Sequence, residues 1–220
     1  RLEGGTKTMH LSAFDKDKEL GIDLDLEADT PVVLNGEGGY SRKSEESPAM
    51  ASIYFSYPSM KTEGRLRIGK RSFAVSGKSW FDREFSSREL GKNQAGWDWF
   101  AIQLDDNREI MLYEIRDKHG SVDRYSSGTF VYPDGAYRRL KKDDYSITVL
   151  DHYKSAHTGA HYPSGWKIAV PSENVSFTVT PLIKDQEFVA THSTGNYYWE
   201  GACGVTGNGK GRAYVELTGY

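Results

Sequence analysis

The stretch Leu20-Gly21-Ile22-Asp23-Leu24-Asp25-Leu26-Glu27 decides the fold class. Its aliphatic residues occupy every second position, and acidic residues or glycine lie between them. Successive side chains of a β-strand point to opposite faces, so this stretch predicts a strand with one buried and one exposed face. A helix would need apolar residues three or four positions apart, and that spacing is nearly absent from the chain. The pattern therefore predicts an all-β protein.

The same alternation continues in both directions along the chain. It predicts further strands over residues 6–14, 51–56, 63–68, 72–81, 97–104, 109–116, 125–132, 145–150, 166–170, 175–181, 197–205 and 211–217. Turn signals such as Pro133-Asp134-Gly135 and Asn208-Gly209 separate the segments, because Asp-Gly and Asn-Gly favour the positive φ of tight hairpins. Many short strands at this spacing are typical of antiparallel barrels or sandwiches.

Composition and charge exclude several classes of protein. Hydrophobic residues make up 37% and charged residues 27% of the 220 residues, which is typical of a chain with a folded core. The formal net charge is −3, so no excess of basic residues indicates nucleic-acid binding. No apolar run approaches the roughly 20 residues of a transmembrane helix. Cys203 is the single cysteine, and we expect it to be a buried structural thiol.

The sequence does not support a metal site, a hydrolase active site or a phosphate-binding loop. His157 and His161 have the spacing of helical zinc ligands, but Thr158-Gly159-Ala160 and Pro163 predict a loop or hairpin there. The sequence contains no Gly-x-Ser-x-Gly elbow, and no Lys-Ser or Lys-Thr follows the glycine-rich run 204–211. We therefore expect no metal and no cofactor.

Two segments interrupt the strand pattern. Residues 35–48 contain glycine, proline, Arg42, Lys43 and three glutamates, which predicts a surface loop. Residues 86–95 are polar and charged, so we expect a domain junction there. The predicted domains are therefore 1–85 and 86–220.

Acidic and aromatic side chains alternate on both sides of this junction. The segments are Ser79-Trp80-Phe81-Asp82-Arg83-Glu84-Phe85 and Gly96-Trp97-Asp98-Trp99-Phe100. Strand alternation places Trp80, Asp82 and Glu84 on one face. A buried carboxylate is costly unless it is paired or neutral, so these acids either form a structural ion-pair network or are held for chemistry.

Several sequence blocks, in this order, resemble those of one family. They are Gly38-Gly39-Tyr40-Ser41-Arg42-Lys43, Ala51-Ser52-Ile53-Tyr54-Phe55-Ser56-Tyr57-Pro58, the two aromatic segments above, Met111-Leu112-Tyr113, Tyr198-Trp199-Glu200-Gly201 and Glu216-Leu217-Thr218-Gly219-Tyr220. The chain resembles the AttH/CrtC family of lipocalin-like proteins over nearly its whole length. That family includes secreted hydrolases, carotenoid 1,2-hydratases (hydroxyneurosporene synthases), and fungal hydratases and cyclases.

The resemblance implies an all-β fold of two lipocalin-like (calycin) antiparallel β-barrels. By that comparison the first barrel is incomplete because the N-terminal segment is missing, so that 1–85 is the C-terminal part of the first barrel and 86–220 is the second. Open strand edges recruit partners, so we expect the missing segment to be a separate chain or part of a neighbouring molecule. The resemblance also implies a periplasmic or secreted bacterial protein.

In the carotenoid hydratases, an acid on the strand that matches residues 79–85 is thought to protonate the substrate double bond. That acid aligns with Asp82, and the aromatic residue two positions before it aligns with Trp80. Those enzymes also carry a histidine and a tryptophan further upstream, which Ile53-Tyr54-Phe55-Ser56-Tyr57 lacks. The departure argues against carotenoid hydration itself.

The resulting hypothesis is a cavity protein for an apolar, polyene-like or terpenoid-like molecule, with hydratase-like or cyclase-like activity. The expected catalytic acids are Asp82 and Glu84, and the expected substrate wall is Trp80, Tyr54, Tyr57, Trp97, Trp99, Tyr113 and Trp199. Burial beside Trp80 would favour a neutral Asp82 that donates a proton, and aromatic faces would stabilise the cation formed.

The alternatives assign the same residues to structure or to binding alone. The acids would then be ion-paired at the barrel junction, Trp97 and Trp99 would be core residues, and Glu200 would be a structural hydrogen-bond acceptor and not a second buried acid. The protein would be a non-catalytic carrier of the bacterial envelope.

Overall fold

The computed structural model describes residues 1–86, 90–189 and 197–220. Its strands are β1 (Leu2–Gly4), β2 (Thr8–Asp15), β3 (Leu20–Ala28), β4 (Val33–Leu34), β5 (Tyr40–Arg42), β6 (Ala51–Ile68), β7 (Arg71–Phe85), β8 (Gln94–Leu104), β9 (Glu109–Asp117), β10 (Ser127–Val131), β11 (Tyr137–Lys141), β12 (Ser146–Val149), β13 (His152–Lys154), β14 (His161–Pro163), β15 (Trp166–Val170), β16 (Val175–Pro181), β17 (Glu187–Val189), β18 (Tyr197–Gly207) and β19 (Gly211–Thr218). Short 3₁₀ turns lie at η1 (Lys142–Asp144) and η2 (Pro171–Glu173). The all-β prediction is confirmed.

The described chain divides into two compact units. The first unit contains Arg1–Val33 and Phe55–Arg83, and the second contains Leu34–Tyr54 and Glu84–Tyr220. Residues 34–54 therefore belong with the second unit, although they precede β7 in the sequence. Residues 87–89 of the expected junction lie outside the described residues, and the division at residue 85 stays a prediction.

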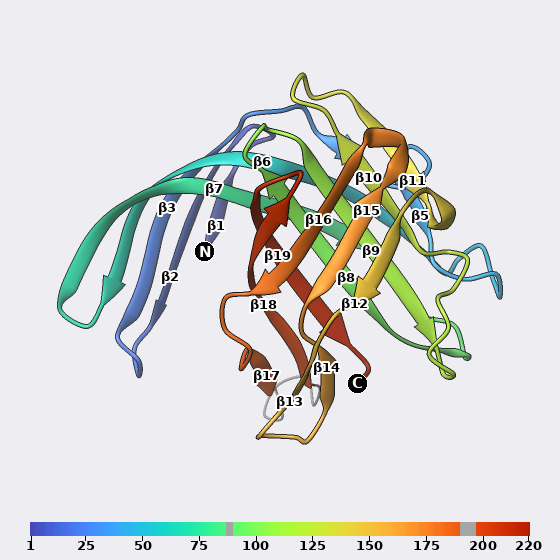
Figure 1. Ribbon diagram of the computed structural model, residues 1–220. Helices are drawn as coiled ribbons and strands as arrows, with labels where there is room; N and C mark the ends of the chain where they lie inside the picture. The colour runs from blue at the N-terminus through green and yellow to red at the C-terminus, as the bar shows by residue number, and fades with distance from the viewer. Residues whose placement is uncertain (87–89, 190–196) are drawn as a thin grey trace. The chain divides into compact units, whose positions relative to one another are not determined.

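In the first unit, antiparallel strands follow the order β1-β2-β3-β6, and β7 also pairs with β6 (Figure 1). The alternation that predicted β3 sorts its side chains as expected, because Leu24 and Leu26 join an apolar cluster with Tyr57 and Met60. Gly64 lies opposite Leu24 in β6 with φ +154°, and a Cβ there would lie 2.1 Å from the backbone oxygen of Asp23. The close approach of the two strands thus requires glycine at this position.

The second unit contains the sheet order β11-β10-β9-β8-β19-β18-β16-β15-β12, with β17 beside β18, and its strands curl around one core (Figure 1). Alternation along β8 directs Phe100, Ile102 and Leu104 into that core. Trp97 and Trp99 therefore lie on the opposite face of the same strand. This arrangement matches the lipocalin-like barrel expected from the sequence.

The surface-loop prediction for residues 35–48 was only partly right. Tyr40–Arg42 forms β5 and pairs with the beginning of β6, while Asn35, Ser41 and Lys43 are buried. The Thr129 hydroxyl donates a hydrogen bond to Asn35 Oδ1 at 2.7 Å. Part of the polarity of this segment thus serves buried contacts within the second unit, while Glu37, Glu45 and Glu46 are exposed.

Two smaller predictions are confirmed. His161 pairs with Lys154 in the β13–β14 hairpin, so the histidine pair does not lie on a helix. Cys203 is buried without a disulfide, and burial raises the pKa of its thiol to about 12. Among the described residues, no helix is long and apolar enough to span a membrane.

Candidate functional site

The expected general acid, Asp82, lies on β7 in the first unit with two hydrogen-bond donors around one carboxylate oxygen. Ser56 Oγ donates to Asp82 Oδ1 at 2.5 Å, and Trp80 Nε1 donates to the same atom at 2.7 Å. Trp80 and Asp82 share a strand face, as the sequence predicted, so the indole N–H reaches its neighbour two positions away. All three side chains are at least half-buried.

Tyr57, an expected wall residue, lies away from this carboxylate. Its ring packs against Phe81 at a centroid distance of 6.3 Å, within the apolar cluster of the first unit. Because Phe81 and Asp82 are neighbours on a strand, their side chains point to opposite faces. Tyr57 therefore stabilises the face of β7 that does not carry Asp82.

The second expected acid, Glu84, belongs to the second unit and is ion-paired there. Lys43 Nζ lies 2.8 Å from Glu84 Oε1, and the side chains are 10% and 31% exposed, respectively. Ser52 Oγ donates a hydrogen bond to the same carboxylate oxygen. Glu84 is thus held by a charge-assisted contact and a hydroxyl hydrogen bond on one oxygen.

The Lys43 ammonium is also enclosed by aromatic rings. It lies 4.1 Å from the ring centroid of Tyr113 and 5.3 Å from that of Tyr54, distances at which a cation is attracted to the π-system. The Tyr54 hydroxyl accepts a hydrogen bond from Trp99 Nε1 at 3.0 Å, and the Tyr113 hydroxyl lies 3.0 Å from Ser41 Oγ. We call Lys43, Glu84, Tyr54, Tyr113 and Trp99 the lysine cage.

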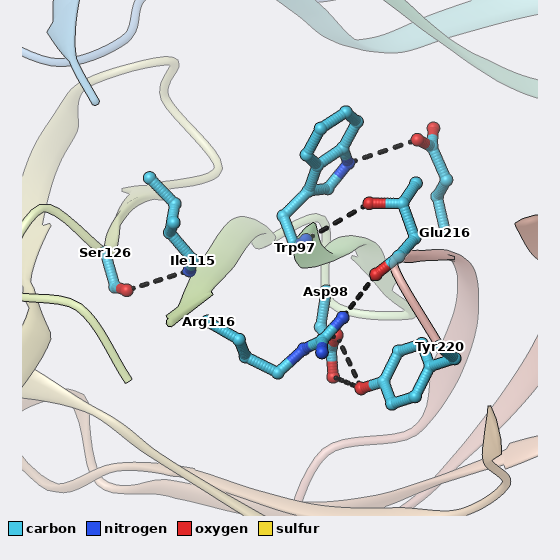
Figure 2. Close-up of polar contacts among 8 residues, drawn as sticks. Trp97, Asp98, Ile115, Arg116, Ser126, Glu216 and Tyr220 are labelled. Atoms are coloured by element: carbon cyan, nitrogen blue, oxygen red, sulfur yellow. Dashed lines mark hydrogen bonds and ion pairs between the residues drawn. The ribbon is translucent and has the colours of Figure 1, made fainter. Parts of the chain in front are cut away.

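Further along β8, the second aromatic segment divides between the two faces of its sheet (Figure 2). On one face Trp97 Nε1 donates to Glu216 Oε1 at 3.1 Å. On the other face Asp98 Oδ1 accepts a hydrogen bond from Arg116 Nε at 2.9 Å, and both Asp98 oxygens accept from the Tyr220 hydroxyl at 2.8 Å. Asp98 is thus an ion-paired structural acid.

Burial sets the protonation of the carboxyl groups on this second face. It raises the pKa of Asp98, while Arg116 and Tyr220 oppose the rise. It raises the pKa of Glu114 to about 7, and the neighbouring charge of Asp98 adds to that rise. Glu114 is therefore a carboxyl group that exchanges its proton near neutral pH.

The remaining expected wall residue, Trp199, lies in the core of the second unit. Its ring centroid is 6.3 Å from that of Trp166, and its Nε1 donates to the backbone oxygen of Lys184 at 2.7 Å. The next residue, Glu200, points to the opposite face of β18, where burial raises the pKa of its carboxyl group.

The structure thus brings four of the expected site residues together, and these are Glu84, Tyr54, Tyr113 and Trp99. It places Asp82 with Trp80 in the first unit and Trp199 in a core. Lys43 was missed as a site residue. No local sequence pattern marks a lysine for burial. The indirect signal is the apolar and aromatic sequence that Lys43 contacts.

Among the described residues, no group of three or more histidine, cysteine or acidic side chains is arranged to hold a metal ion. Surface hollows occur in the described parts of both units. One of about 470 Å³ lies in the first unit between Glu3, His10, Asp25 and Glu63, and one of about 410 Å³ lies in the second unit over Tyr40, Ile53 and Phe85. Neither includes Asp82 or the charged end of Lys43.

Comparison with known proteins gives consistent results. A family model described as AttH-like matches residues 1–220. The crystal structure of a protein of Nitrosomonas europaea assigned as AttH shows 33% identity and a TM-score of 0.90, covering 100% of this chain and 68% of that one. The crystal structure of kievitone hydratase from Nectria haematococca shows 22% identity and a TM-score of 0.76, covering 96% of this chain and 64% of that one. No match is found among curated proteins.

The two structural relatives differ in what they support. The chain spans about two thirds of the length of each. The Nitrosomonas protein is similar in sequence and in fold, whereas the hydratase, at 22% identity, is evidence for the fold alone.

Proposed function

Since the chain belongs to the AttH-like family, we propose that it binds a largely apolar small molecule of the polyene or terpenoid kind and hydrates or cyclises it at a C=C bond. The observation that carries this proposal is the carboxyl group of Asp82, whose Oδ1 receives hydrogen bonds from Ser56 and Trp80. Two donors on one oxygen fix the orientation of the group.

In the proposed reaction, the Asp82 carboxyl group donates its proton to one carbon of the double bond. The π-electrons form the new C–H bond, and the second carbon becomes a cation. Water then adds to that carbon and returns a proton to the Asp82 carboxylate, which restores the acid. In ring closure a second double bond attacks the cation instead, and the proton returned to Asp82 comes from the substrate.

Ser56 and Trp80 have a defined role in this cycle. When Asp82 gives up its proton, the negative charge that develops is already faced by an O–H and an N–H group at 2.5 and 2.7 Å. Preoriented donors of this kind stabilise developing charge without reorganisation during the reaction. The indole ring of Trp80 adds an aromatic surface next to the acid.

Kievitone hydratase shares this fold at 22% identity, so the proposed reaction class rests on Asp82 and not on that likeness. In this proposal Glu84 is the ion-pair partner of Lys43, whose Nζ lies 2.8 Å from it, and not the proton donor.

A second candidate function is non-catalytic binding of an apolar ligand. The lysine cage favours it, because the faces of Tyr54 and Tyr113 are directed at the Lys43 ammonium. Rings that already hold an internal cation are less available to stabilise a substrate cation.

Asp82→Asn separates the two candidates. Asparagine keeps the size of the side chain and an oxygen that accepts hydrogen bonds, but it has no acidic proton. We expect the variant to bind alkenes from a terpenoid and polyene panel as tightly as the wild type, measured by tryptophan fluorescence, while formation of the water adduct, measured by mass spectrometry in ¹⁸O-water, is lost. Asp23→Asn, whose side chain is 67% exposed in the same unit, is the matched control.

Undiminished turnover by Asp82→Asn would exclude Asp82 as the acid. Binding of a ligand by the wild type without formation of any product across the panel would favour the carrier.

A further inference from the structure

Tyr220 follows β19 and is held by two charged side chains of neighbouring strands (Figure 2). Its hydroxyl donates to both oxygens of Asp98 at 2.8 Å, and its ring lies under the Arg116 guanidinium at 3.8 Å. Arg116 Nη2 also donates to the backbone oxygen of Thr218. We call Asp98, Arg116 and Tyr220 the latch, because together they fix the segment that follows β19.

A second carboxyl group lies directly beside the latch. Glu114 on β9 is the cross-strand partner of Asp98 on β8, and side chains of opposed residues lie roughly 5 Å apart on the same face. Its carboxyl group receives no hydrogen bond from any described residue. Asp98 and Glu114 therefore lie near the same arginine, Arg116, and Glu114 has no hydrogen-bond donor among the described residues.

We propose that Glu114 is a pH-sensing residue that controls the latch, so that its deprotonation loosens the hold of Asp98 and Arg116 on Tyr220. With Glu114 neutral, the positive charge of Arg116 balances the single charge of Asp98. With Glu114 ionised, the half-buried cluster carries a surplus negative charge, and Glu114 competes with Asp98 for the guanidinium. Like charges at opposed positions of adjacent strands destabilise the arrangement that holds them together.

The other groups that face Glu114 do not remove this competition. The Tyr145 hydroxyl is committed to the backbone oxygen of Tyr113 at 2.9 Å, and the Tyr220 hydroxyl is committed to Asp98. The charges of Lys142 and Arg116 favour ionisation of Glu114, but burial and Asp98 outweigh them and raise its pKa to about 7. The transition thus lies near neutral pH.

Loosening of the latch affects one end of the second unit. The ring of Tyr220 packs on that of Tyr162 at a centroid distance of 5.5 Å, and Tyr162 is only 1% exposed within the core cluster. The C-terminal end of the drawn chain accordingly lies beside β14 (Figure 1). Release of Tyr220 would uncover Tyr162, so the device opens this end of the core as the pH rises. The inference does not depend on Asp82 or on catalysis.

The direction and size of the pH effect on latch closure follow from the pKa of Glu114. In the closed latch the pKa is raised from 4.5 to about 7, so closure is fully favoured below about pH 4.5, weakens as the pH rises, and reaches its weakest level above about pH 7. If the open latch leaves Glu114 with its ordinary pKa, the equilibrium between closed and open forms shifts by up to about 300-fold over the whole titration, from well below pH 4.5 to well above pH 7.

Amide hydrogen exchange of residues 217–220 at about pH 5 and about pH 8, corrected for intrinsic rates, tests this inference. We expect protection in the wild type to fall by about 70-fold between the two conditions, and protection in Glu114→Gln to change by less than about 3-fold. Glu200→Gln is the matched control, since Glu200 also has a pKa raised by burial but lies on the other sheet face, and it should behave as the wild type.

A fall in Glu114→Gln as large as that in the wild type would overturn the inference. If the variant does not fold, the ¹³C chemical shift of the Glu114 carboxyl group in the wild type decides. A midpoint near 7 supports the inference, and one near 4.5 removes it.

Discussion

Replacement of Lys43 by methionine will measure what the buried ion pair contributes to the second unit. Methionine keeps most of the length of the side chain and removes its charge. The change leaves the carboxylate of Glu84, 31% exposed, with the hydrogen bond from Ser52. We expect a loss in the free energy of unfolding, because a half-buried anion then lacks its counter-ion.

The size of the loss follows from burial. Removing one partner of a fully buried pair costs about 3–5 kcal/mol, and water reaches part of the Glu84 carboxylate, so Lys43→Met should cost about 2 kcal/mol. Glu84→Gln should cost about 3 kcal/mol, since it leaves the more deeply buried ammonium between two tyrosine rings. The double variant should cost about 2 kcal/mol, which is well below the combined cost of the single variants and implies a coupling energy of about 3 kcal/mol.

The assay is equilibrium urea unfolding at neutral pH of the wild type, both single variants and the double variant, with the m-value checked for constancy. The matched control is the exposed pair of Lys61 and Glu63, which has a similar N–O distance of 2.9 Å but side chains that are 62% and 61% exposed. That pair should show no measurable coupling. Additive effects of Lys43→Met and Glu84→Gln, within about 0.5 kcal/mol, would refute the reasoning.

Three further outcomes test the core and the backbone. Phe100→Ala removes a fully buried ring and should cost about 4 kcal/mol in urea unfolding, whereas a cost below about 1 kcal/mol would contradict the assigned core. Cys203, with its thiol pKa raised to about 12, should not react with Ellman's reagent at neutral pH until the protein unfolds, and rapid labelling of the native protein would show that it is accessible. Gly64→Ala should lower the melting temperature far more than Gly38→Ala. A Cβ at Gly64 would lie 2.1 Å from a backbone oxygen, whereas a Cβ at Gly38 would have no atom within 4 Å. Equal effects would argue against the close approach of β3 and β6.

The strands and the family were predictable because their signals lie in the sequence itself. The alternation over residues 20–27 predicted β3, which spans Leu20–Ala28, because side chains two apart on a strand share a face in any strand. The same rule predicted that Trp80 and Asp82 lie side by side, and the indole donates to the carboxylate at 2.7 Å. The AttH-like assignment rested on short blocks of sequence in a fixed order, and the family match over residues 1–220 confirms it.

The lysine cage was only partly predictable. Tyr54, Tyr113, Trp99 and Glu84 were selected as aromatic and acidic residues of the resembling blocks, but the residue that they surround was assigned to a surface loop. A lysine in a stretch with glycine, proline and several glutamates carries no local mark of burial.

By itself, therefore, the sequence determined the all-β class, most strand positions, the family and the pairing of Trp80 with Asp82, since each depends on the identity of near neighbours. Only the tertiary structure decided that residues 34–54 belong with the second unit, that Lys43 is buried against Glu84, and that Asp98, Arg116 and Glu114 surround Tyr220. These contacts join residues far apart in the chain, as with Ser41 and Tyr113, which are 72 positions apart. The order and curvature of the strands decide which side chains meet across such distances. Alternation within one strand specifies neither the order nor the curvature.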